Sequence, residues 1–192
     1  TLLRGNVGSR LDKVRRGECQ ASLLALAGLK RLGLEAEAGV VLDPDAMVPS
    51  AGQGIVGVTV REDDEELREL LAGIEDPQAR AVSTAERALL AELDGSCRTP
   101  IGGHARHLPD GRIALTGLVA RADGSFLLRR AVEGERADAA ELGADLGASL
   151  RDRAFPGVGG WWRWSRRRGL GQVSRCFERS RALRVIPAFH EV

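Results

Sequence analysis

The chain has 192 residues, enough for one large domain or two small ones with a core each. Its 28 lysines and arginines balance 27 aspartates and glutamates, and the net charge of +1 excludes a general electrostatic attraction to nucleic acid or to a membrane. The three cysteines lie far apart and no histidine is paired with them, which argues against a disulfide framework or a zinc site and fits a reducing cytoplasm.

The first part of the chain predicts an α/β arrangement. Residues 1–4 are expected to end a strand, Asn6 to cap a helix over residues 7–16, and Gly17 to stop it. The apolar run at 21–26 (ASLLAL) predicts a buried strand, and residues 28–33 predict a helical turn closed by Gly33. Strand, helix, strand and helix in this order indicate a parallel sheet.

A proline-bounded loop over 44–49 and the turn Gly52-Gln53-Gly54 precede an alternating strand over 55–60. We interpret this turn as a hinge or a close approach of backbone, or as a plain entry into the strand. The acidic residues 61–76 predict a solvated surface helix.

Residues 78–150 predict a separate, compact α+β domain. One face of its first helix carries apolar residues in helical spacing, and that helix is expected to end at Asp94-Gly95: Val82, Ala85, Leu89 and Leu93. Three strands are expected over 101–107, 113–119 and 126–132, joined by Asp-Gly hairpin turns. A final helix is marked by Leu142, Leu146 and Leu150.

The tail over 154–192 has a different character. Trp161, Trp162 and Trp164 precede three arginines at 166–168. Such a patch suits nucleic acid or an anionic membrane, but an unstructured or aberrant extension is the favoured interpretation because the rest of the chain is neutral. We therefore expect neither nucleic acid nor a membrane as a partner.

Two groups of residues suggest chemistry. The run RGNVGSR at 4–10 places Arg4 and Arg10 at a glycine-rich turn before a helix, which predicts an anion site, and Arg31 is expected at the same sheet edge. Cys97 lies in a loop beside Arg98, and a neighbouring cation favours the reactive thiolate. The alternative is a small hydrophobe packed beneath the loop.

His104 and His107 alternate along the strand that follows Cys97. Their spacing marks them as ordinary strand residues, so a protease-like Cys-His mechanism is not indicated.

Several separate motifs occur in one order: RGNVGSRLDKVRRGE, LALAGLKRLGL, VPSAGQGIVGVTVRED, STAERALLAELDGSCRTPIGGHA and LVARADGS. Through them the chain, over about residues 3–152, resembles the porphobilinogen deaminases (hydroxymethylbilane synthases). The resemblance implies a transferase of tetrapyrrole (haem and chlorophyll) biosynthesis. It would condense four porphobilinogen units head to tail and release ammonia.

The resemblance also implies the domains and the site. Residues 1–54 would be the latter half of a periplasmic-binding-protein-like domain 2, residues 55–72 a return segment of domain 1, and residues 73–153 the cofactor-carrying α+β domain 3. Cys97 would hold a dipyrromethane cofactor by a thioether, and Arg4, Arg10 and Arg31 would bind cofactor and substrate carboxylates. No metal is implied, and the whole enzyme would be a cytoplasmic monomer.

The catalytic aspartate implied by the resemblance is expected upstream of Thr1, in an N-terminal domain missing from this sequence. We therefore expect the isolated chain to be inactive and to lack a cofactor that it cannot load. The alternative is a non-catalytic anion-binding module or pseudoenzyme that uses the three arginines without covalent chemistry.

Overall fold

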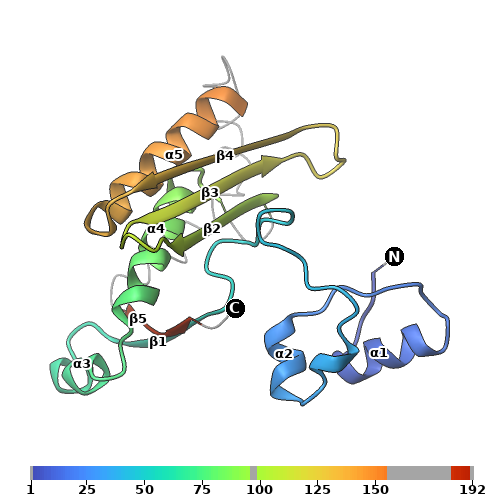
Figure 1. Ribbon diagram of the computed structural model, residues 1–192. Helices are drawn as coiled ribbons and strands as arrows, with labels where there is room; N and C mark the ends of the chain where they lie inside the picture. Colours follow the sequence, from blue (N-terminus) through green and yellow to red (C-terminus); the bar gives the residue numbers. More distant parts are fainter. Residues whose placement is uncertain (1, 96–98, 155–182, 191–192) are drawn as a thin grey trace, which may run out of the picture. The chain divides into compact units, whose positions relative to one another are not determined.

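The computed structural model describes residues 2–95, 99–154 and 183–190 (Figure 1). The chain divides into two compact units, the first extending to Asp43 and the second comprising Pro44–His190. Each unit has its own helices or strands.

The described part of the first unit contains short helices. α1 (Val7–Arg15) begins after Asn6, whose Oδ1 accepts a hydrogen bond from the Ser9 N–H at 2.9 Å. α2 (Leu26–Arg31) and the 3-10 turn η1 (Glu35–Glu37) follow. Gly17 and Gly33 have φ angles of 73° and 66°, and their N–H groups bond back to the last turns of α1 and α2. The predicted cap and both predicted glycine stops are confirmed.

The strands predicted for this unit are wrong, and so is the parallel sheet. Residues 2–4 and 21–25 form no strand, and Leu26 already belongs to α2. Alanine and leucine favour helices, and the run at 21–26 has no β-branched residue that would favour a strand. Residues 21–25 also have no neighbouring strand among the described residues with which to form a ladder.

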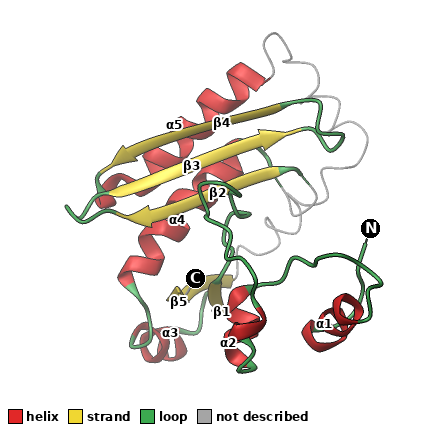
Figure 2. Cartoon of the chain, turned by 45° about the vertical axis from the view of Figure 1, so that its right-hand side comes forward, coloured by secondary structure: helices red, strands yellow, loops and turns green. Residues whose placement is uncertain are grey.

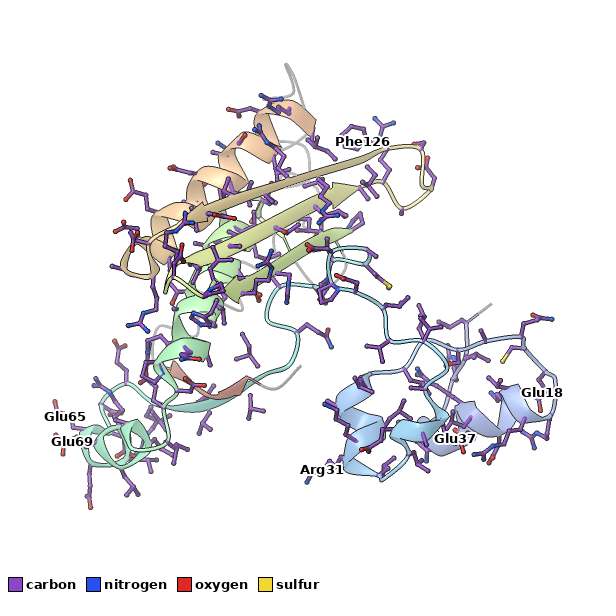
Figure 3. All side chains as sticks on the ribbon, in the orientation of Figure 1. Glu18, Arg31, Glu37, Glu65, Glu69 and Phe126 are labelled. Atoms are coloured by element: carbon purple, nitrogen blue, oxygen red, sulfur yellow. The ribbon has the colours of Figure 1, made fainter. Side chains whose placement is uncertain are left out.

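The second unit opens with a two-stranded antiparallel sheet. β1 (Ile55–Arg61), a predicted strand, pairs with β5 (Leu183–His190), with an irregularity between Val56 and Gly57. β5 lies in the tail and was not predicted, because no sustained periodicity marks it. α3 (Glu65–Ala72) follows β1 and confirms the solvated helix, with Glu65 and Glu69 projecting from it (Figure 3).

The rest of the second unit is an antiparallel sheet covered by two helices. Its elements are α4 (Pro77–Glu92), β2 (Ile101–His107), β3 (Ile113–Ala120), β4 (Leu127–Gly134), the 3-10 turn η2 (Arg136–Asp138) and α5 (Ala139–Ala154). The strand order is β2-β3-β4, and α4 and α5 pack together on one face of the sheet (Figure 2). The predicted helix, three strands and helix are confirmed.

The core lies between this sheet and the two helices. The six largest of its fully buried side chains, each at most 1% exposed, are Val82, Leu89, Ile113, Leu115, Leu146 and Leu150. Val82 and Leu89 of α4 and Leu146 and Leu150 of α5 are among them; Ala85 and Leu93 are also buried, and Leu142 is half-buried against the core. The apolar periodicity therefore correctly gave the buried faces of both helices.

Several predicted features lie outside the described residues. They are Cys97, Cys176, and the tryptophans and arginines at 161–168. Among the helices of the described ranges, none is long and apolar enough to cross a membrane.

Candidate functional site

The turn before α1 places two of the three predicted arginines. Arg4 is exposed, and its carbonyl accepts a hydrogen bond from the Lys13 Nζ at 3.1 Å. The Arg10 Nε donates to the Gly5 carbonyl at 3.0 Å, which holds that side chain against the turn. Gly5 has a φ of 122°, and a Cβ there would collide with the Ser9 hydroxyl, so this turn requires glycine.

Arg31 comes from the neighbouring helix. α2 lies against the start of α1, since a Cβ on Gly28 would be 3.7 Å from the Val7 side chain. Arg31 is exposed in the last turn of α2, where its side chain projects outward (Figure 3). The structure thus brings α1 and α2 together, but as adjacent helices and not at a sheet edge.

These three arginines differ from the nearby Arg15 and Arg16 in their ion pairs. Arg15 forms ion pairs with Asp12 and Glu37, and Arg16 with Glu18. Arg4, Arg10 and Arg31 form no ion pair with any residue that the structure describes. Their guanidinium groups are therefore available to bind an external carboxylate or phosphate.

Cys97 lies outside the described residues, but both flanks of its segment are well defined. Asp94 has a φ of 48°, and the Gly95 N–H returns to the Leu90 carbonyl at 2.8 Å, which closes the end of α4. A Cβ on Gly95 would come within 2.9 Å of the Ile101 side chain at the start of β2. The two ends of the Cys97 segment are thus packed against each other.

The histidines after Cys97 have structural surroundings. The His107 Nε2 lies 3.1 Å from the Gln78 carbonyl, so this side chain ties β2 to the start of α4. His104 is half-buried on the same strand. Cys19 is 8% exposed and lies in the first unit. Nowhere in the described ranges do three or more histidine, cysteine, aspartate or glutamate side chains gather as a metal site would require.

One notable residue was missed by sequence reasoning. Glu86 on α4 is 2% exposed, and its two carboxylate oxygens accept backbone hydrogen bonds from Gly52 and Ala105, each at 2.7 Å. The pKa of Glu86 is raised to about 7, because the effect of burial exceeds the opposing effect of the two backbone N–H groups. Its spacing in the sequence could have indicated that Glu86 is buried, because it lies four residues after Val82 and three before Leu89, on the buried face of the helix.

The structure also shows why the turn at Gly52 contains glycine. Gly52 and Gly54 have φ angles of 78° and 82°, and no atom lies within 4 Å of a Cβ placed on Gly52. Glycine is therefore favoured there by backbone conformation and not by a close neighbour.

The described residues thus define an arginine-bearing helical unit joined to an α+β unit in which a cysteine separates α4 from β2. Two family models match the chain: "Porphobilinogen deaminase, dipyromethane cofactor binding domain" over residues 1–69 and "Porphobilinogen deaminase, C-terminal domain" over residues 81–152. Cys97 falls within the second match.

Proteins named porphobilinogen deaminase are similar to about four fifths of the chain. The one from Nitrobacter winogradskyi is 49% identical over 152 residues, which are 79% of this chain and 48% of the relative. The one from Syntrophobacter fumaroxidans is 46% identical over 150 residues, 78% of this chain and 48% of the relative. The chain spans about half the length of the curated relatives it matches. The chain belongs to the porphobilinogen deaminase family.

Proposed function

We propose that the chain supplies the cofactor-carrying part of a hydroxymethylbilane synthase, a transferase that condenses four porphobilinogen units head to tail with release of ammonia. The observation that carries this proposal is the ordered match of both family models, with Cys97 inside the second. Bound through a thioether to Cys97, a dipyrromethane would supply the primer on which the tetrapyrrole grows.

Arg4, Arg10 and Arg31 would bind the carboxylates of the cofactor and the substrate. Each pyrrole carries an acetate and a propionate, so negative charge accumulates as the chain of pyrroles lengthens. Guanidinium groups match carboxylates with two parallel hydrogen bonds. The absence of ion pairs at these three residues within the described ranges, beside the paired Arg15 and Arg16, supports this role.

The Cys97 thiol would act as an anchor and not as a group that turns over. The described residues on its two sides, Gly95 and Ile101, lie close to each other. Flanks held in this way would present the cofactor from a defined place on the α+β unit. Cys97 would therefore set the position of the primer while other groups perform the proton transfers.

We propose the finer organisation from the family resemblance. Residues 1–54 would be the latter half of a periplasmic-binding-protein-like domain, residues 55–72 a return segment of a first domain, and residues 73–153 the cofactor-carrying domain. The complete protein would be a cytoplasmic monomer. The remaining half of the relatives' length would supply an N-terminal domain with the catalytic aspartate, so this chain alone would not turn over porphobilinogen.

Fusion to the N-terminal half of the Nitrobacter winogradskyi relative tests this function. The fusion protein is expected to release ammonia from porphobilinogen and to form a bilane, whereas the chain alone gives only the background rate. Cys97→Ala in the fusion abolishes both signals if the thiol carries the primer. Turnover by the isolated chain would contradict the proposal, and so would an active Cys97→Ala fusion. Retained binding without turnover in a correctly folded fusion favours the anion-binding module.

A further inference from the structure

Glu86 is an ionisable side chain inside the core of the second unit, and the proposed chemistry leaves it without a role. It is 2% exposed, whereas its helix neighbours Val82 and Leu89 are apolar core residues at 1% and 0%. Burying a carboxylate is costly unless its oxygens are hydrogen-bonded. No buried side-chain nitrogen or oxygen of the described residues lacks a hydrogen-bond partner, and Glu86 satisfies this condition with backbone N–H groups alone.

The geometry requires two acceptors. Oε2 accepts from the Gly52 N–H and Oε1 from the Ala105 N–H, both at 2.7 Å. A glutamine offers one carbonyl oxygen and would turn its NH2 group toward the other N–H donor. An apolar residue would leave both N–H donors buried without a partner. Each unpaired donor then lowers the stability of the fold by its desolvation cost. The side chain therefore acts as a two-point connector between backbone segments.

The connected segments are separate in sequence. α4, which carries Glu86, runs into the Cys97 segment, and β2, which carries Ala105, begins after it. The third segment is the stretch from Pro44 to Gly52. It is also bound to the sheet by the Gly103 N–H, which donates to the Pro49 carbonyl at 2.8 Å, and by Asp45 and Arg129, which form an ion pair at 2.9 Å.

We propose that Glu86 is a positioning residue for the cofactor-carrying segment, which it serves by fixing α4, β2 and the Gly52 turn to one another on either side of Cys97. The part of this proposal that concerns the cofactor rests on the proposed function. The connection of the three segments stands on the hydrogen bonds alone. Glu86 touches neither substrate nor cofactor in this role and acts through the elements that flank Cys97.

Amide hydrogen exchange in the whole 192-residue chain tests the connection at single residues. Above pH 7, where Glu86 is ionised, the amides of Gly52 and Ala105 both exchange faster in Glu86→Ala, by roughly tenfold to a hundredfold, the range expected for a lost hydrogen bond to a charged group. In Glu86→Gln only one of the two loses protection. Core amides such as that of Leu115 keep their rates. The matched control is Glu92→Gln on the same helix, whose carboxylate pairs with Arg151 and bonds neither amide.

Two exchange results would overturn the proposal. Unchanged rates at Gly52 and Ala105 would mean that the carboxylate does not hold them. A uniform rise across the whole second unit would mean that Glu86 contributes only to global stability.

Alkylation of Cys97 by iodoacetamide, followed by peptide mass in a Cys176→Ser background, tests the positioning itself. We expect a faster rate in Glu86→Gln than in the unmodified chain, because the end of α4 and the start of β2, which flank Cys97 in the sequence, separate more often, and no change in Glu92→Gln. A rate that stays constant in Glu86→Gln, while the Gly52 or the Ala105 amide loses protection there, would refute the positioning role. Neither readout requires activity, so failure here is distinct from failure of the proposed function.

Discussion

The packing of α4 against α5 leads to a sharp prediction at Gly143. In the middle of a helix, replacing glycine by alanine normally stabilises a protein by about 1 kcal/mol. At Gly143 an added Cβ would collide with the Ala85 carbonyl oxygen and come within 2.8 Å of the Ala88 Cβ. The obstacle is backbone on a neighbouring helix, so no rotamer change relieves it and the helices must separate.

Overpacking of a core costs about 1–3 kcal/mol, and a backbone obstacle places Gly143→Ala near the upper end. Subtracting the gain in helix propensity of about 1 kcal/mol leaves a net destabilisation of about 2 kcal/mol. For a unit of this size each kcal/mol lowers Tm by roughly 4–8 °C. Thermal and urea unfolding followed by circular dichroism measures both quantities.

The control uses an exposed position on the same helix. The difference in the free energy of unfolding between Asp145→Ala and Asp145→Gly gives the effect of helix propensity in α5 without a packing contribution. The alanine variant is expected to be the more stable by about 1 kcal/mol. A rise in Tm for Gly143→Ala, like that of Asp145→Ala over Asp145→Gly, would contradict the close approach of α4 and α5 at Gly143.

Three further predictions concern charge and backbone conformation. Because the pKa of Glu86 is raised from 4.5 to about 7, the folded chain keeps a proton that the unfolded chain has released between these values. The free energy of unfolding therefore falls by about 3 kcal/mol as pH rises through this window, and urea titrations should show this slope in the unmodified chain but not in Glu86→Gln. Asp94→Gly should raise the free energy of unfolding by about 1 kcal/mol, because Asp94 has a φ of 48° that glycine adopts without strain; a lower urea midpoint would contradict this. Arg4→Gln should weaken porphobilinogen binding by roughly tenfold in equilibrium dialysis, whereas Arg15→Gln, at a residue already paired with Asp12 and Glu37, should not; equal losses would remove the distinction between paired and unpaired arginines.

The α+β unit could be predicted well from the sequence because its signals are local. The apolar spacing from Val82 to Leu93 follows the period of a helix that buries one face, and Asp110-Gly111 and Asp123-Gly124 mark hairpins between adjacent strands. In the first unit, Asn6 and Gly17 correctly gave the bounds of α1 because capping depends on neighbouring residues alone.

The failures concern partners that are distant in sequence. The run at 21–26 is apolar, but a strand also needs a neighbouring strand, and periodicity does not show whether one exists. The pairing of β1 with β5 joins residues more than a hundred positions apart, and no motif announces it. Glu86 was overlooked because its acceptor role depends on Gly52 and Ala105, which the fold alone brings together.

The most direct test of the central claim is the intact mass of the chain fused to the N-terminal half of the Nitrobacter winogradskyi relative, after purification from cells that make porphobilinogen. We predict a mass increase equal to one dipyrromethane, located by peptide mapping at Cys97 and lost in Cys97→Ala. The isolated 192-residue chain is predicted to keep its unmodified mass. A fusion protein without the addition, or an addition that persists after Cys97→Ala, would contradict the assignment of Cys97 as the cofactor thiol.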